Sequence, residues 1–147
     1  MRRTFAYGTF ALILIFALCQ SFHIQAIYAQ QGEVLSIDDV IKGTNPATKT
    51  KAQIDSYFKQ VKEKDARGEG IVVNVLPGRK LSSHDARVLI LTPASKPEKG
   101  YNVVLFANEQ ALSELKKNDR VSFEGKINMR SPYKGGSIDV IGTYKKL

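Results

Sequence analysis

Residues 121–130, VSFEGKINMR, alternate between apolar and polar side chains along their whole length. Such a period of two is that of a β-strand with one face in a core. One side carries Val121, Phe123, Ile127 and Met129, and the other carries Ser122, Glu124, Lys126, Asn128 and Arg130. Gly125 stands where an inward side chain is expected, which is typical of a sharp bend in a coiled strand. The stretch therefore predicts a curved strand packed on a core.

Other extended runs lie on both sides of this strand. They are rich in β-branched and apolar residues and cover 71–76, 86–92, 101–107 and 137–144. A short helix is expected after the third run, with Ala111, Leu112 and Leu115 facing inward. Closing five curved strands removes the exposed sheet edges. The order predicts a mainly β fold, a five-stranded OB-fold barrel with a helix between strands three and four.

A helical arm is expected ahead of the barrel, over residues 30–68, which leaves 69–147 for the barrel itself. Ser36 is the predicted N-cap of a first helix that Gly43 ends. A second helix is predicted over 49–64, with an apolar stripe at i, i+3, i+4 and i+7. The stripe consists of Ile54, Tyr57, Phe58 and Val61. We expect it to pack on the core rather than to bind a partner.

Residues 1–29 have the layout of a secretory signal peptide. A basic start is followed by an apolar run over 10–18, and Ala29 is a small residue at a suitable cleavage position. The run is shorter than the about 20 apolar residues that a membrane-spanning helix needs. Cleavage predicts an exported protein, periplasmic or associated with the cell envelope. If the segment stays uncleaved, it is the only expected contact with a membrane.

Cys19 leaves open a lipid anchor, although Leu18 replaces the small residue that lipoprotein signals place before the acylated cysteine. The mature chain would contain no cysteine, so its domain would have to be stable without disulfides. It would carry 20 Lys and Arg against 14 Asp and Glu, a net charge of +6. This balance favours an anionic partner, and a merely basic soluble protein is an equal alternative.

The segment GEGIVVNV at 68–75 and the block LSELKKNDRVSFEG at 112–125 carry a resemblance to a known group of proteins. Over 66–147 the chain resembles the exported bacterial OB-fold proteins of the anticodon-binding-like (tRNA_anti-like) family. The helix over 54–61 is similar to the segment that often precedes the barrel in such proteins. The resemblance implies an OB barrel, and relatives by fold bind single-stranded nucleic acid, oligosaccharide or protein. Fold by itself does not choose among these ligands.

OB barrels usually bind across strands two and three, between the loop that follows strand one and the loop that follows strand four. Here these loops are 77–85 and 131–136. Basic side chains would neutralise an anionic ligand, and a tyrosine could stack on a base or a sugar ring. The candidate ligand-binding residues are Arg79, Lys80, His84, Lys126, Arg130, Tyr133 and Lys134. Tyr101 and Phe106 are weaker stacking candidates.

The residue inventory argues against catalysis. Adjacent residues of one loop, Ser82 to Asp85, cannot form a relay that needs partners brought together by the fold. His84 is the only histidine after the signal, so no metal site and no cofactor are expected.

The leading hypothesis is a non-catalytic exported binding or adaptor module whose partner is an anionic polymer, single-stranded nucleic acid or acidic oligosaccharide, or a protein. The alternative is a structural subunit of an envelope complex that docks through its N-terminal helices.

Overall fold

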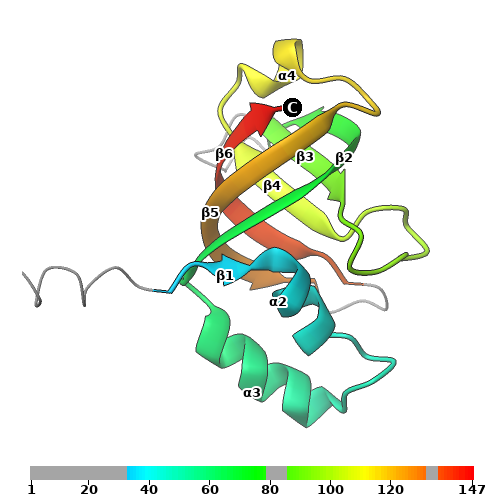
Figure 1. Ribbon diagram of the computed structural model, residues 1–147, viewed down its shortest axis with the longest axis vertical. Coiled ribbons are helices and arrows are strands. Elements are labelled where there is room, and N and C mark those ends of the chain that lie inside the picture. Colours follow the sequence, from blue (N-terminus) through cyan, green and yellow to red (C-terminus); the bar gives the residue numbers. More distant parts are fainter. Residues whose placement is uncertain (1–32, 79–85, 132–135) are drawn as a thin grey trace, which may run out of the picture. The chain divides into compact units, whose positions relative to one another are not determined.

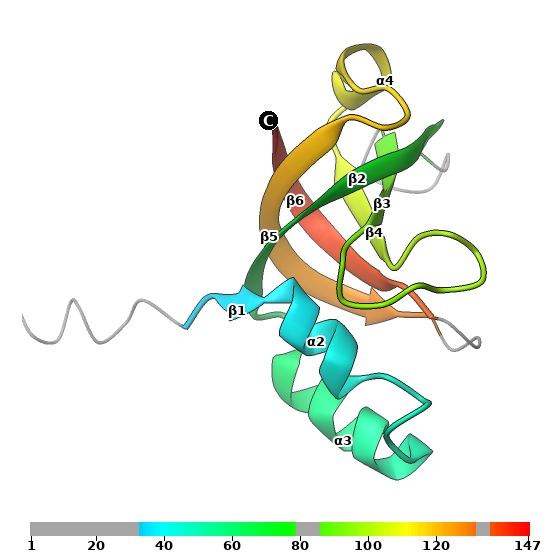
Figure 2. The ribbon, with the colours of Figure 1, turned by 45° about the vertical axis from the view of Figure 1, so that its right-hand side comes forward.

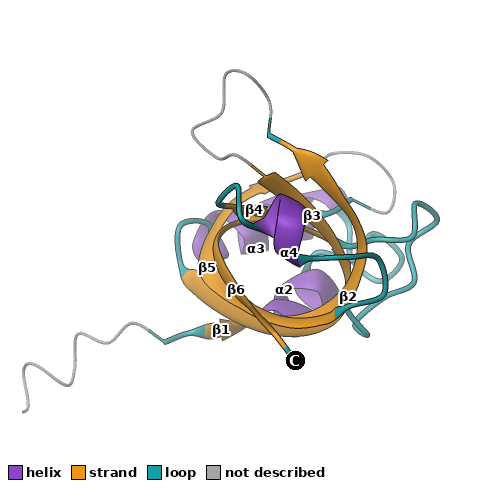
Figure 3. Ribbon diagram, turned by 90° about the horizontal axis from the view of Figure 1, so that it is seen from above, coloured by secondary structure: helices purple, strands orange, loops and turns teal. Residues whose placement is uncertain are grey.

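Five strands close into a barrel in the computed structural model, which describes residues 33–78, 86–131 and 136–147. They are β2 (Asp65–Pro77), β3 (Ala86–Leu91), β4 (Val103–Ala107), β5 (Arg120–Arg130) and β6 (Ile138–Lys146). The hydrogen-bonded order is β2-β3-β4-β6-β5, and β5 pairs again with β2, so the sheet forms a ring (Figures 1 and 3). Only β4 and β6 run parallel within this ring. The expected OB-type barrel is confirmed.

Strand β2 belongs to both halves of the ring. Its first half pairs with β5, from Asp65 to Ile71, and its second half pairs with β3, from Ile71 to Pro77. The strand begins at Asp65, so the expected boundary between arm and barrel at residue 69 comes four residues late. Polar outward residues and two inward glycines conceal the strand pattern over this stretch.

The N-terminal helices are part of the same core as the barrel. Strand β1 (Leu35–Ser36) adds to β2 in parallel and leads directly into α2 (Ile37–Gly43). Ile37 and Val40 are fully buried and belong to one apolar cluster with residues of all five barrel strands. Figure 2 shows α2 at one end of the barrel and α4 (Ala111–Glu114) at the other. Both openings are therefore covered by the chain's own helices.

Helix α3 (Lys51–Val61) starts with a capping box, in which Thr50 and Gln53 satisfy each other's backbone amides. Its predicted stripe faces inward, since Ile54 and Val61 are buried and Tyr57 and Phe58 pack against the core. The expectation that this stripe is a core contact is confirmed.

Gly68 makes room for the side chain of Ile37 at the end of the barrel that α2 covers. A Cβ atom at this position would overlap Cγ2 of Ile37 and lie 3.0 Å from the Phe123 ring. The Ile37 side chain therefore packs directly against the backbone of Gly68.

A second close approach joins β5 and β6. Gly125 lies opposite Gly142, and a Cβ atom on Gly125 would overlap the carbonyl oxygen of Ile141. Gly125, where the sequence predicts a bend, thus allows a close approach of two paired strands, and the sequence patterns did not single out its partner Gly142.

Two inward expectations are wrong. Met129 is 58% exposed, because a bulge between Ile127 and Met129 shifts the register by one residue and turns the side chain outward. Leu112 is 39% exposed, because α4 makes only one turn and covers the barrel with Ala111 and Leu115, four residues apart.

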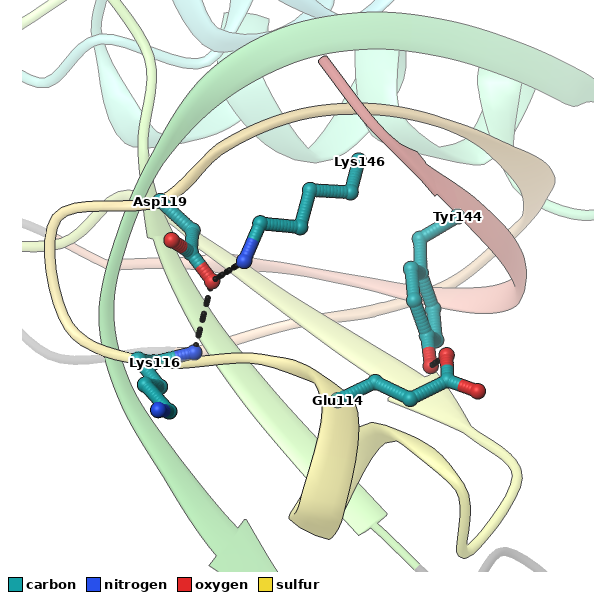
Figure 4. A network of polar contacts seen from close by, with 5 residues as sticks. All are labelled: Glu114, Lys116, Asp119, Tyr144 and Lys146. Carbon is teal, nitrogen blue, oxygen red and sulfur yellow. Dashed lines mark hydrogen bonds and ion pairs between the residues drawn. The ribbon is translucent and has the colours of Figure 1, made fainter.

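Polar contacts hold α4 and the following turn on β6 (Figure 4). The Tyr144 hydroxyl donates to Glu114 Oε2 at 2.6 Å. Burial, and then this hydrogen bond and the charge of Glu114, raise the pKa of Tyr144 to about 12. Asp119 accepts from the Lys116 amide at 2.8 Å and pairs with Lys146 at 2.7 Å. These contacts, the Lys146 bond foremost, lower the pKa of Asp119 below its ordinary value.

We predict that Gly68→Val lowers the free energy of unfolding by about 1–3 kcal/mol, because the new side chain competes with Ile37 for one space. Urea denaturation measures the effect. Glu69→Val is the matched control, since Glu69 is exposed on the outward side of the same strand. Adding Ile37→Ala to Gly68→Val should cost less than Ile37→Ala alone. Equal losses of unfolding free energy in Gly68→Val and Glu69→Val would contradict the packing of Ile37 against Gly68.

We predict that the Tyr144 hydrogen bond makes the domain sensitive to alkali. The folded pKa of about 12 lies above the ordinary 10.0, so this stabilisation is complete below pH 10 and is lost between pH 10 and 12. Wild-type protein should lose stability over this range faster than Tyr144→Phe, as measured by urea midpoints at successive pH values. Parallel pH curves for the two proteins would refute the role of this bond.

Candidate functional site

Two rows of outward side chains cross the barrel on β2, β3, β4, β6 and β5. The first row follows the register partners Leu76, Arg87, Phe106, Ile141 and Lys126. The second row follows Asn74, Leu89, Val104, Asp139 and Met129. The apolar members of the two rows, apart from Leu76, form a surface that we call the apolar face, made of Leu89, Val104, Phe106, Ile141 and Met129. Asp139 lies within this surface, between Val104 and Met129.

The members of the apolar face point away from the barrel interior, although Val104 is itself nearly buried, with 8% exposed. Val88, Ile90, Leu105 and Val140 alternate with its members along the strands and are fully buried inside the barrel. Phe106 is half-buried and points outward, whereas its neighbour Leu105 points inward. The helices lie at the ends of the barrel and not over these strands (Figures 1 and 2). Strands that are apolar on both sides are typical of a sheet with a second partner.

Charged side chains flank the apolar face on two sides. Arg87 Nε donates to the Pro77 carbonyl oxygen at 3.2 Å, so the guanidinium is held beside the start of loop 78–85. Lys126 lies next to Ile141 on β5 and pairs with Asp65 at 3.7 Å, with both side chains largely exposed. An exposed pair of this kind contributes little to stability and can be opened by an anion.

A broad groove of about 1340 Å³ lies on another part of the molecule. It crosses the first half of β2 and parts of β5 and β6, and the start of α2 and the segment 92–96 border it. Its charged side chains are of both signs, and two of them, Arg120 and Glu69, pair at 4.0 Å. Apolar residues such as Ile71, Leu91 and Phe123 also line the groove, but its charges are of both signs and offer no uniform field for an anionic ligand. The apolar face is therefore the better candidate site.

The predicted site residues divide into three groups. Arg79, Lys80, His84, Tyr133 and Lys134 lie outside the described residues. Lys126 lies at the edge of the apolar face. Arg130 serves the fold, because its Nη2 donates to the Thr44 carbonyl oxygen at 3.2 Å and ties the end of α2 to β5.

The two predicted binding loops begin at opposite ends of β4. Ala86, which follows the first loop, pairs with Ala107 at the end of β4. Ile138, which follows the second loop, pairs with Val103 at its start. A ligand that contacts both loops would therefore have to extend over β4 and the apolar face.

Asn102 organises the connection between β3 and β4. Its buried side chain accepts from the Thr92 amide at 2.8 Å and donates to the Thr92 carbonyl oxygen at 3.1 Å. It also reaches the carbonyl and hydroxyl oxygens of Ser95, both at 3.3 Å. The segment 92–102 is thus held to β4 by its own polar contacts.

Lys99 lies just before β4, where this segment returns to the barrel. Its ammonium is 3.3 Å from Ser137 Oγ and 4.7 Å from the centre of the Tyr101 ring. Burial lowers the pKa of Lys99 below its ordinary value, and the negative charge of Asp139 partly offsets this. Tyr101, one of the weaker stacking candidates, thus contacts a lysine.

Within the residues that the structure describes, no group of three or more His, Cys, Asp or Glu side chains could hold a metal ion. No helix in the described part of the chain has both the length and the apolar character needed to cross a membrane.

Sequence reasoning missed most of the apolar face, although a signal for it exists. The runs ARVLIL at 86–91 and VVLFA at 103–107 are apolar at nearly every position, rather than at every second one. Such runs indicate burial on both sides of a sheet. Arg87 is the only charged residue in either run. The same signal could not assign Lys99 or Met129 to this surface. A network of polar contacts in the segment 92–102 positions Lys99, and a bulge in β5 turns Met129 outward.

Comparison with known proteins identifies no family. No protein-family model and no curated protein matches the chain. Six chains of solved structures are similar to it. One belongs to the crystal structure of the S. pombe Stn1-ten1 complex, with 14% identity and a TM-score of 0.36. The match covers 56% of this chain and 57% of that chain, which is less than two thirds of either, and nothing further rests on it.

Proposed function

We propose that this domain is a non-catalytic binding module and that its ligand lies across the apolar face. The outward apolar side chains of β3, β4 and β6 carry the proposal. They lie outside a core that is already complete and are not covered by the described helices. Half-buried Leu89, Phe106 and Ile141 would gain further burial from a ligand, at roughly 25 cal/mol per Å² of apolar surface.

Single-stranded nucleic acid fits this surface better than an acidic oligosaccharide does. A base has an apolar ring face, which could stack on Phe106, and its phosphate could pair with Arg87 or Lys126. Sugars need several hydrogen-bonding side chains for their hydroxyl groups, and the two rows supply only Asn74 and Asp139 beyond the two cations. We also propose that the chain belongs to the exported anticodon-binding-like family that it resembles.

The alternative function, a structural subunit that docks through its N-terminal helices, has less support. The apolar residues of α2 and α3 are used inside the domain, where Ile37, Ile54 and Val61 are buried. Docking would have to use the polar outer side of α3. A pull-down that needs α3 surface residues and not Phe106 would favour this alternative.

We predict that Phe106→Ala weakens binding to a labelled oligothymidylate of about ten nucleotides by about 1–3 kcal/mol, because a stacked base loses its platform. Phe106→Tyr should retain most of the affinity. Fluorescence anisotropy at low salt measures both, with thermal midpoints as a check on folding.

Leu112→Ala is the matched control, since Leu112 is an exposed apolar residue on α4, away from the face. Arg87→Gln should lower the slope of log affinity against log salt by about 0.7. Absence of salt-dependent binding by the wild type, or an equal loss in Leu112→Ala, would contradict the proposal. Stronger binding of heparin fragments than of the oligonucleotide would favour the acidic oligosaccharide.

Export is proposed from the leader sequence. We predict that bacterial cells expressing the full chain release a mature protein that begins at Gln30, following cleavage after Ala29. Intact-mass spectrometry of the periplasmic fraction measures the new N-terminus and would also detect a lipid on Cys19. A full-length mass in the cytoplasmic fraction alone would contradict export.

A further inference from the structure

We propose that Lys99 binds an anionic group of the ligand, so that the ligand runs along β4 from Arg87 toward Ser137. This inference rests on the proposed function, because it adds a contact and a direction to the same site. The sequence patterns did not single out Lys99.

Lys99 reaches the outer side of the barrel next to the apolar face. Inward and outward side chains alternate on a strand, and Ile138 is buried inside the barrel. Ser137 and Asp139 flank Ile138 and therefore share the outward side, where neighbouring residues leave Ser137 only 4% exposed. The Lys99 ammonium donates to Ser137 Oγ and lies within the electrostatic reach of Asp139. Asp139 belongs to the same row as Val104 and Met129.

The lysine is positioned before any ligand arrives. Asn102 fixes the segment 92–95 by its side chain, and its backbone bonds Ile90 on one side and Ile138 on the other. The ring of Tyr101 lies under the ammonium and limits its freedom. A positioned side chain loses less conformational entropy on binding than a free surface lysine does.

The ammonium is also incompletely solvated. Burial disfavours its charged form, and Asp139 offsets only part of this effect. An ammonium has three N–H donors, and the described side chains supply one hydrogen-bond acceptor, Ser137 Oγ. A phosphate oxygen would supply another acceptor together with a negative charge.

The positions of the two cations define a path. Arg87 lies opposite Phe106, near the end of β4, and Lys99 lies just before its start. Four residues separate Phe106 from Asn102, which corresponds to about 13 Å at the rise of a strand. The apolar residues Val104 and Phe106 lie between the two charges. Val104 is only 8% exposed, so a single strand along this path would stack a base on Phe106 and place phosphates at both ends.

A path across the strands, from Arg87 to Lys126, is the competing geometry. Lys126 is paired with Asp65 at 3.7 Å and stands on exposed surface. Binding along that row would make Lys126 and not Lys99 the second cation.

The test compares three single variants, Lys99→Gln, Lys126→Gln and Lys96→Gln, in oligothymidylate binding at several salt concentrations. Lys96 is the matched control, an exposed lysine of the same segment. We expect Lys99→Gln to reduce the magnitude of the slope of log affinity against log salt by about 0.7, and Lys99→Arg to keep the wild-type slope. The control variant Lys96→Gln should keep the wild-type slope. A lower slope for Lys126→Gln together with an unchanged slope for Lys99→Gln would overturn the proposed path.

A second measurement separates this inference from the proposed function. Inorganic phosphate is titrated into protein with ¹³C-labelled lysine, and the Cε–Hε signals are followed by NMR. The Lys99 signal should shift and saturate at lower phosphate than that of Lys96. If the wild type binds no oligonucleotide but Lys99 responds in this way, the proposed function fails and the anion site stands. If Lys99 responds no more than Lys96, the anion site is refuted whatever the oligonucleotide does.

Discussion

The fit of Ile37 over Gly68 is the contact on which the rest of the structure depends. A five-stranded barrel is open at both ends, and its core is complete only when both openings are covered. Helix α4 covers one opening with Ala111 and Leu115. At the other, β1 and α2 bring Ile37 onto Gly68, an inward position of β2 that has no side chain. The N-terminal arm is therefore part of the barrel's core.

This arrangement determines which surfaces remain for binding. The apolar residues of α2 and α3 are used inside the domain, and the groove beside β2 is lined by charges of both signs, of which Arg120 and Glu69 pair. The apolar face differs from both. It has Leu89, Phe106 and Ile141 on neighbouring strands, outside a core that needs none of them. The proposed ligand would remove more of this apolar surface from water.

The strands were predictable wherever the side chains alternate or where β-branched residues form a run, as in 121–127 and 86–91. The errors arose where a backbone irregularity intervened. A bulge turned Met129 outward, and the single turn of α4 left Leu112 exposed. The start of β2 was missed because its inward positions are Gly68 and Gly70, which carry no apolar side chain to reveal the pattern. Of the predicted site residues, Lys126 lies at the apolar face and Arg130 holds α2, whereas five lie outside the described residues.

The amino-acid sequence by itself determined the class of the fold, because the period of the apolar residues, the turn residues and the helix before the last two strands are local properties of the chain. It also determined that the stripe of α3 faces a core. Only the tertiary structure decided that α2 closes the barrel and that Lys99 lies beside Ser137. It also decided which outward residues gather into one face. These features depend on strand register and on contacts between segments far apart in sequence, such as Lys99 and Ser137, and no local pattern encodes them.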